Sequence, residues 1–277
     1  MVKHTLAWPP AQGERDGAEQ LTQDILYEAR DRIAYVTLNR PQARNALTFD
    51  MYEALFELAG RLSNDASVAA VVISGAGEKA FAAGTDISEF RAIKTPEDAL
   101  AYERRIDRVL GALEACPKPV IAAISGACTG GGAAIAACCD LRIATTNLRF
   151  GFPVARTLGN CLSMGNYARL NTLLGPSRAK DLIFTARLMG AEEAKATGFI
   201  SEILADNGAL MKRAGELATI VAGHAPLTLR ATKEAFRRLA TQAPAGEDLI
   251  TMCYMSDDFR EGMSAFLEKR PPNWQGR

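Results

Sequence analysis

The sequence predicts an α/β fold followed by a mostly helical C-terminal region. From Ile25 to about Gly190, short apolar runs typical of strands alternate with runs whose apolar residues recur at helical spacing. After Gly190 the helical spacing prevails until Pro271 and Pro272 end it. We therefore expect an N-terminal arm at residues 1–24, an α/β core at 25–200 and a helical region of the kind often used for assembly at 201–277.

Short apolar runs predict the strands of the core. The first 20 residues contain no such run and no signal-peptide stretch, and their prolines and glycines indicate an arm or a disordered lead-in. The predicted strands are Ile25–Ala29, Ile33–Asn39, Ala69–Ser74, Val120–Ser125, Leu141–Thr145 and Phe199–Leu204.

Capping residues mark where two of the core helices begin. Thr48 can cap a helix whose apolar residues are spaced four, three and four apart. Thr95 indicates the N-cap of a second helix, because a proline follows it and Asp98 occupies the third helical position. The apolar stripe of the first helix consists of Met51, Leu55, Leu58 and Leu62. The other predicted helices are Ala133–Cys139, Ala191–Ala196, Ala209–Ala222, Leu227–Leu239, Glu247–Met255 and Asp258–Lys269.

Charge and composition exclude several classes of function. The chain has 32 Lys+Arg and 32 Asp+Glu, and it has no basic patch along the sequence, so we expect no nucleic-acid partner. The longest apolar runs, such as Ala133–Cys139, are far shorter than the roughly 18–20 residues that span a bilayer, so we expect no membrane partner. The 6 cysteines show no CxxC spacing, which is typical of reduced thiols in the cytoplasm.

Two glycine- and alanine-rich loops are the strongest functional signals. Gly130, Gly131 and Gly132 lie between a buried strand and a helix, where the main chain can approach a ligand and helix N–H groups are free. The segment Phe81–Asp86 also follows a strand, and its small residues leave N–H groups accessible. Two main-chain donors that converge from two loops are the arrangement that holds an oxyanion.

Other kinds of site fit the sequence less well. Gly75 and Gly77 follow a strand as in a dinucleotide site, but Asp98, about twenty residues on, opens a helix and does not end a strand. The only histidines, His4 and His224, are far apart and no HExxH motif exists, so we expect no metal. His224 is expected to cap or end a helix.

Several segments together resemble a known family. In chain order they are Asn39–Leu47, Ala80–Ile87, Lys118–Gly126, Gly130–Gly132, Cys139–Ala144 and Glu261–Arg270. From about Ile25 to Arg270 the chain resembles the crotonase superfamily of enoyl-CoA hydratases and isomerases. The resemblance implies a spiral of ββα units and a helical region that forms a homotrimer or a dimer of trimers. It also implies a coenzyme A thioester as substrate, no permanently bound cofactor, and a thioester oxygen held by the N–H groups of Ala83 and Gly131.

The resemblance further implies which residues contact coenzyme A. They are Gln42 to Arg44, the loop of Ala83, Gly84, Thr85 and Asp86, and Lys269 donated by a neighbouring subunit. Arg44 and Lys269 fit a solvated surface equally well, because isolated cations usually face water.

The chain departs from the hydratase pattern where the chemistry is done. Hydratases of the family carry two glutamates, and the matching residues here are Ala134 and Val154, neither of which can exchange a proton. The usual two-glutamate addition of water is therefore not expected. The segment Phe150–Ser163, which contains Val154, is one residue longer than the hydratase pattern. The extra residue can bring other side chains into the pocket.

Several residues could replace the lost acid and base. Arg156 could hold a substrate carboxylate, and Cys161 could act as a nucleophile, although most such cysteines are core residues. Asn160 and Ser163 lie in the same loop, while Glu89 and Glu103 fit solvated helix faces better than the pocket. Isomerisation, decarboxylation, hydrolysis and silent binding of an acyl-CoA all stay open.

Overall fold

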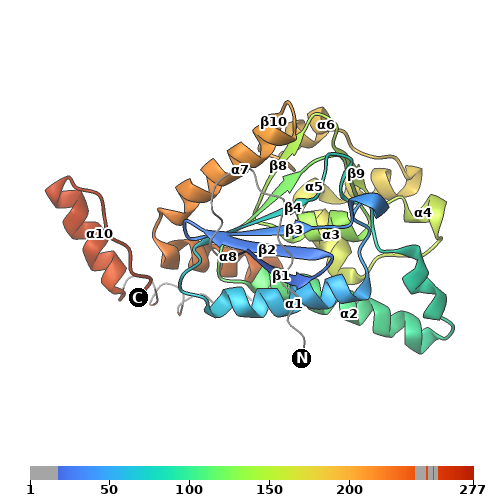
Figure 1. The fold of residues 1–277 in the computed structure, drawn as a ribbon, viewed down its shortest axis with the longest axis horizontal. Coiled ribbons are helices and arrows are strands. Elements are labelled where there is room, and N and C mark those ends of the chain that lie inside the picture. The colour runs from blue at the N-terminus through green and yellow to red at the C-terminus, as the bar shows by residue number, and fades with distance from the viewer. Residues whose placement is uncertain (1–17, 241–247, 249–251, 253–254) are drawn as a thin grey trace.

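Two sheets form the body of the protein in the computed structural model, which describes residues 18–240, 248, 252 and 255–277 (Figure 1). The larger sheet has seven strands in the order β1-β2-β3-β4-β6-β8-β10. The pairings β1–β2 and β2–β3 are antiparallel and the other pairings are parallel. The strands are β1 (Ala18–Thr22), β2 (Ile25–Arg30), β3 (Ile33–Leu38), β4 (Ala70–Gly75), β6 (Val120–Ile124), β8 (Leu141–Thr145) and β10 (Glu202–Leu204).

The smaller sheet has three parallel strands, each of which follows a strand of the larger sheet. They are β5 (Ala80–Ala82), β7 (Ala127–Thr129) and β9 (Arg149–Gly151). Helical segments come after each pair of strands. This repeated order confirms the predicted α/β fold with its ββα units. It also brings the carboxyl ends of β5, β7 and β9 to one edge of the smaller sheet.

Helices cover the sheets and begin where the sequence places their caps. The Thr48 hydroxyl accepts the Met51 N–H at 3.2 Å, and Thr95 and Asp98 form a reciprocal capping box. The α-helices are α1 (Phe49–Asn64), α2 (Pro96–Ala115), α3 (Gly131–Cys138), α4 (Val154–Thr157), α5 (Met164–Thr185), α6 (Ala191–Ala196), α7 (Asn207–Ala222), α8 (Pro226–Ala240) and α10 (Asp257–Glu268), and the 3-10 helices are η1 (Pro41–Ala43) and η2 (Ile87–Ala92).

The core lies on both faces of the larger sheet. On one face, α1 buries its predicted stripe, including Leu55 and Leu58, against the strands. On the other face, Ala214 and Ala218 of α7 pack on Val72 and Ile121, because alanine lets the helix approach the sheet closely. The body therefore extends beyond residue 200: β10 pairs with β8, and α7 is part of the core. The boundary expected at residues 200 and 201 is corrected accordingly.

Other expectations also differ from the structure. Ala18–Thr22, expected in the arm, pairs with β2 as an edge strand. Phe199–Leu204 contributes only Glu202–Leu204 as a strand. Helix α5 was missed because Gly175, with φ of 73°, and Pro176 interrupt its pattern. The predicted helix Glu247–Met255 lies almost entirely outside the described residues.

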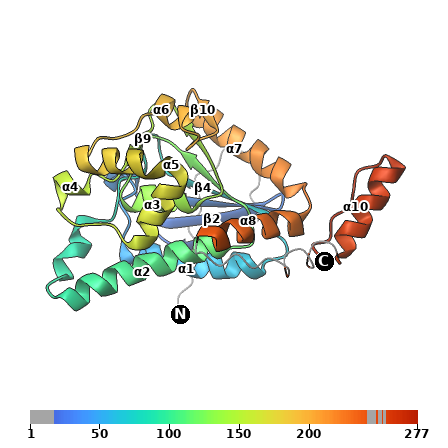
Figure 2. The ribbon, with the colours of Figure 1, turned by 180° about the vertical axis from the view of Figure 1, so that it is seen from behind.

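Helix α10 lies apart from the body in both views (Figures 1 and 2). Helices α4 and α5 lie at the other end of the molecule in the same views. Cys138 and Cys139 are buried, and burial raises the pKa of the Cys139 thiol to about 12. Within the described part of the chain, no helix combines the length and apolar character needed to cross a bilayer.

Candidate active site

One pocket of about 190 Å³ is bordered by the loops that follow β5, β7 and β9. These loops contribute Ala83 and Gly84, then Gly130 and Gly131, then Val154. A Cβ atom on Gly130 would lie 3.4 Å from the Gly84 Cα atom, so the first two loops are in contact. The convergence predicted from the two glycine- and alanine-rich segments therefore occurs, and the parallel order of the smaller sheet is its cause.

Gly131 presents a free main-chain N–H group at the start of α3. Gly130, with φ of 52°, is the N-cap and provides no side-chain cap. Among the described residues, no acceptor bonds the Gly131 N–H, which also lies at the positive end of the helix dipole. Only glycine fits here, because a Cβ atom would lie 2.1 Å from the Tyr52 hydroxyl oxygen.

Ala83, the second predicted donor, is already hydrogen-bonded inside the protein. Its N–H donates to the Arg44 carbonyl oxygen at 3.0 Å, so the expectation of two free donors holds only for Gly131. Arg44 has φ of 52°, and this left-handed turn brings its carbonyl to the end of β5. In the same loop, the N–H groups of Gly84 and Thr85 have no acceptor among the described residues.

Asn45 and Arg40 fix this turn from within. Asn45 is fully buried and donates to the carbonyls of Ala76 and Ala80 at 3.0 and 2.7 Å. Arg40 pairs with Asp86 at 3.0 Å and donates to the Ala46 carbonyl at 2.6 Å. Arg40 and Asn45, which flank the segment expected to contact coenzyme A, thus have a structural role that is not evident from the sequence.

Most of the residues expected to contact coenzyme A do not border the pocket, namely Gln42 to Arg44, Asp86 and Lys269. Asp86 caps η2 by accepting the Ser88 N–H at 3.0 Å, and hydrogen bonds from Ser88 and Arg40 lower the pKa of its carboxyl. Arg44 is exposed beside η1, and Lys269 is exposed after α10. Gly84 and Thr85 do border the pocket.

Ala134 and Val154, the two positions where the family resemblance implies glutamates, face this pocket. Ala134 is buried on α3 and Val154 is half-buried at the start of α4, and both line the pocket. The surrounding wall is mostly apolar and includes Ile106, Phe152 and Leu162. Such a wall is typical of a site for an apolar ligand, and neither Ala134 nor Val154 can exchange a proton.

Glu103 is the only carboxylate among the described residues that line the pocket. It is half-buried on α2, and burial, with a smaller contribution from the charge of Asp107, raises the pKa of its carboxyl. The sequence predicts a solvated helix face for Glu103, and the structure corrects this by placing Glu103 in the pocket wall. Glu89 does not line the pocket, and its carboxylate accepts the Phe49 N–H at 3.1 Å.

Three hydroxyl groups form a chain along the same wall. The Tyr52 and Thr85 hydroxyl oxygens are 3.0 Å apart, and those of Thr85 and Tyr102 are 3.1 Å apart. Burial raises the pKa of both tyrosines, that of Tyr102 to about 12. Two hydrogen bonds use two of the three hydroxyl protons, so one proton is available to a ligand. Sequence reasoning missed both tyrosines, whose spacing fits ordinary helix positions.

The loop after β9 contributes only some of its predicted residues. Asn160 and Cys161 line the pocket, and Cys161 is exposed. Arg156 is exposed and does not line the pocket, because α4 turns its side chain outward. Ser163 instead caps α5 and donates to an Asp107 oxygen at 2.7 Å.

The glycines of the alternative dinucleotide site lie in a different setting. Gly75 ends β4, and a Cβ atom there would lie 2.4 Å from two carbonyl oxygens, those of Ala80 and Phe81. The chain continues from Gly77 into strand β5, where a dinucleotide site requires a helix. Gly75 therefore serves close packing of the main chain.

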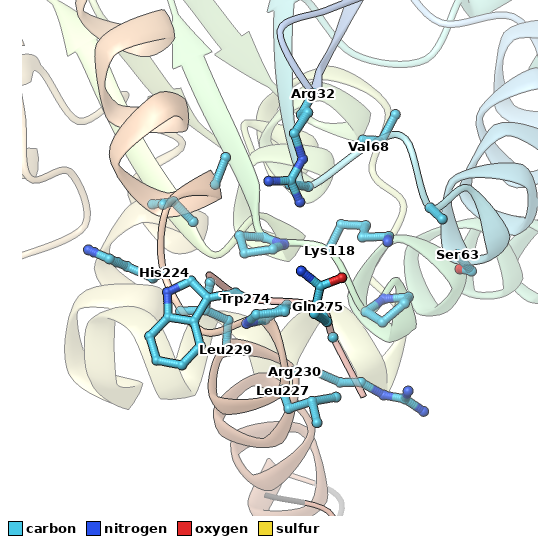
Figure 3. Close-up of a pocket in the computed structure, with 18 residues that line it drawn as sticks. Arg32, Ser63, Val68, Lys118, His224, Leu227, Leu229, Arg230, Trp274 and Gln275 are labelled. Atoms are coloured by element: carbon cyan, nitrogen blue, oxygen red, sulfur yellow. The ribbon is translucent and has the colours of Figure 1, made fainter. Parts of the chain in front are cut away.

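A second cavity, of about 240 Å³, lies beyond the amino ends of β4 and β6 (Figure 3). Arg32, Lys118 and Gln275 surround one space in this view. His224, which follows α7 as expected for a helix end, also borders it. None of the residues predicted for the active site lines this cavity.

Comparisons with known proteins agree with this architecture. The family model described as "Enoyl-CoA hydratase/isomerase" matches residues 28–277. A short-chain-enoyl-CoA hydratase from Clostridium acetobutylicum is 37% identical over 252 residues, which cover 89% of this chain and 95% of that relative.

Solved structures give the same result. An enoyl-CoA hydratase/carnithine racemase from Magnetospirillum magneticum has a TM-score of 0.85 and 35% identity, over 92% of this chain and 97% of that one. DspI from Pseudomonas aeruginosa has a TM-score of 0.84 and 31% identity, over 92% of this chain and 97% of that one.

Proposed function

The chain belongs to the enoyl-CoA hydratase/isomerase family, and we propose from this premise that it converts acyl-CoA thioesters through an enolate whose oxygen is bound by the Gly131 N–H. The carbonyl oxygen of a thioester gains negative charge when its α-carbon loses a proton. A main-chain donor fixed at a helix N-terminus stabilises that charge without reorganising. The free Gly131 N–H, facing a mostly apolar pocket, is the observation that carries the proposal.

Ala83 is proposed as the second donor. Its N–H, which donates to the Arg44 carbonyl oxygen, would have to be shared between that oxygen and the thioester oxygen, or leave the first for the second. Losing one oxyanion donor typically costs roughly 3–4 kcal/mol of transition-state stabilisation in other enzymes, so this exchange matters for the rate. A complex with a non-hydrolysable acyl-CoA analogue would reveal whether the bond to Arg44 opens.

The proposed chemistry excludes the usual two-glutamate hydration. Adding water to an enoyl thioester needs one group to activate the water and a route to deliver a proton to carbon. Ala134 and Val154 can do neither. We also propose that Lys269 reaches coenzyme A only across a subunit contact in a homotrimer, since α10 lies apart from α4 and α5 (Figure 1).

A panel of thioesters tests the proposal. The purified protein is assayed with crotonyl-CoA, 3-enoyl-CoA, malonyl-type CoA and aryl-CoA thioesters, and coenzyme A binding is measured by titration calorimetry. Turnover of a thioester other than by hydration of crotonyl-CoA supports the proposal. Rapid hydration of crotonyl-CoA contradicts the expected loss of that route. Binding of coenzyme A with no turnover of any thioester favours a catalytically silent acyl-CoA-binding protein. The replacement of both glutamates is the observation that supports this second candidate.

A further inference from the structure

We infer that Glu103 of α2 is the catalytic base and acid of this pocket, and that the reaction is a one-base proton shift that moves a double bond of an enoyl-CoA. This inference rests on the proposed function, because it assumes that a thioester oxygen binds at Gly131. It replaces the two missing glutamates with one carboxylate that comes from a different element of the fold.

The position of Glu103 in the pocket is the first observation that supports this role. Glu103 lines the same pocket as Gly131, Ala134 and Val154, and no other described residue that lines it has a carboxylate. The Glu103 carboxylate makes no hydrogen bond or ion pair with any described residue. By contrast, Asp107 and Glu114 of the same helix are held by Ser163 and Arg169. Among the acids of α2, Glu103 is therefore the one that both lines the pocket and is free to act on a ligand.

The surroundings of Glu103 suit proton transfer. Partial burial favours its protonated form, which brings a carboxylic acid closer to the neutral range in which an acid and base both work. The charge of Glu103 in turn contributes to the raised pKa of Tyr102 and of Tyr52. Because Tyr52 is in contact with Gly131, the carboxylate and the proposed oxyanion donor share one electrostatic environment.

The other titratable groups of the pocket are weaker candidates. Tyr52 and Tyr102 have raised pKa values, so neither gives up its proton readily near neutral pH. Their hydroxyls are committed to Thr85. Cys161 lies in the exposed part of the loop after β9.

A single carboxylate favours one class of reaction. Glu103 removes a proton from the carbon between the carbonyl and the double bond of a 3-enoyl thioester. The C–H electron pair forms a new C=C bond, and the carbonyl electron pair moves to the oxygen held at Gly131. The same carboxyl group then returns the proton to the terminal carbon of the dienolate, which gives the 2-enoyl thioester. The proton that leaves is the proton that returns, so neither water nor a second acid is consumed.

Matched variants test the assignment. Glu103→Gln keeps the side-chain size and removes the base, and Glu97→Gln makes the same charge change on an exposed part of α2 outside the pocket. Conversion of 3-enoyl-CoA to 2-enoyl-CoA and exchange of the α-protons of butyryl-CoA with heavy water are measured for both. We expect Glu103→Gln to lower kcat and the exchange rate by about 100-fold or more with KM nearly unchanged. Glu97→Gln should stay within about twofold of the wild type, and circular dichroism verifies that both variants fold.

The outcomes separate this inference from the proposed function. If the wild type neither exchanges α-protons nor turns over any thioester, the proposed function fails and the role of Glu103 fails with it. If the wild type is active and Glu103→Gln keeps its activity, only the role of Glu103 is overturned. If Glu103→Gln abolishes turnover of another thioester while 3-enoyl-CoA is never converted, the one-base double-bond shift is overturned. Partial recovery of exchange in Glu103→Asp supports a carboxylate base at this position.

Discussion

The Tyr52 hydroxyl oxygen occupies the place where a side chain at residue 131 would begin. A Cβ atom on Gly131 would lie 2.1 Å from it, well inside van der Waals contact. Tyr52 of helix α1 therefore packs against the turn that presents the Gly131 N–H. The same Tyr52 hydroxyl begins the hydrogen-bonded chain to Thr85 and Tyr102.

Adding a methyl group at residue 131 should displace Tyr52. We expect Gly131→Ala to lower the free energy of unfolding by about 1–3 kcal/mol, as other overpacked cores do. In a Tyr52→Phe background the same change should cost less, because the hydroxyl is gone. Urea unfolding of the single and double variants measures the difference. Gly111→Ala, where a Cβ atom meets nothing within 4 Å, is the control, and strictly additive effects would contradict the contact.

Removing the charge of Glu103 should stabilise the fold at neutral pH. Because the pKa of Glu103 is raised in the folded state, its stabilising contribution is greatest below the ordinary glutamate pKa and is lost as pH rises through the raised value. Glu103→Gln should therefore unfold at higher urea than the wild type at pH 7, with the difference shrinking toward pH 4. An unchanged difference between these pH values would argue against the burial of this carboxyl.

Placing glutamates at residues 134 and 154 should confer hydration. We expect the double variant Ala134→Glu with Val154→Glu to hydrate crotonyl-CoA faster than the wild type, since both positions line the pocket. The double variant with glutamine at both positions has the same size without the acid and should show no gain. The rate is followed by loss of the enoyl absorbance. Equal rates for the two double variants would mean that these positions do not reach the thioester.

The cap at Asp86 should contribute to stability only when it is ionised. Asp86 accepts hydrogen bonds from Ser88 and pairs with Arg40, and these contacts lower its pKa. We expect Asp86→Ala to cost about 1 kcal/mol at pH 7, the usual loss for a helix cap. The stabilisation is present above the ordinary aspartate pKa and is lost as pH falls through the lowered value, so the cost should diminish in acid. Denaturant unfolding at pH 7 and at pH 3 compares the two states.

Cys161 should be reactive but dispensable. It is exposed at the pocket, whereas Cys116, Cys128, Cys138 and Cys139 are buried. A thiol reagent should modify Cys161 in the folded protein, and a bound acyl-CoA should slow that modification, as peptide mass spectrometry can measure. If Glu103 transfers the proton, Cys161→Ala should keep kcat within about threefold. Complete loss of turnover in Cys161→Ala would instead favour the nucleophile considered in the sequence analysis.

The larger sheet could be predicted closely, and the smaller sheet could not. Leu141–Thr145 was predicted residue for residue, because five apolar-rich residues bounded by turns are enough to identify a strand. The strands β5, β7 and β9 have three residues each, too few to display any period. Their pairing nevertheless decides where the loops of Ala83 and Gly131 meet.

Local patterns also misplaced the functional side chains. Glu103 fits a solvated face of α2, because the loop that makes this face a pocket wall lies more than fifty residues away, near Leu158. The bond from the Ala83 N–H to Arg44 depends on a left-handed turn that the sequence does not specify. The sequence and its resemblance to a family identified Gly130 to Gly132, whereas only the three-dimensional structure placed Glu103 in the pocket.

In the proposed site, the three short parallel strands separate the loops that would hold the thioester oxygen from the loop whose side chains would determine the reaction. Ala83 and Gly131 are fixed between packed elements, while the stretch from Val154 to Leu162 connects β9 to α5 largely at the surface. Changes of length or residue type in that stretch leave the sheets intact. The side chains of this stretch can therefore change in evolution while the loops of Ala83 and Gly131 stay the same. A protein engineer could alter the substrate range of the enzyme by changing the same stretch.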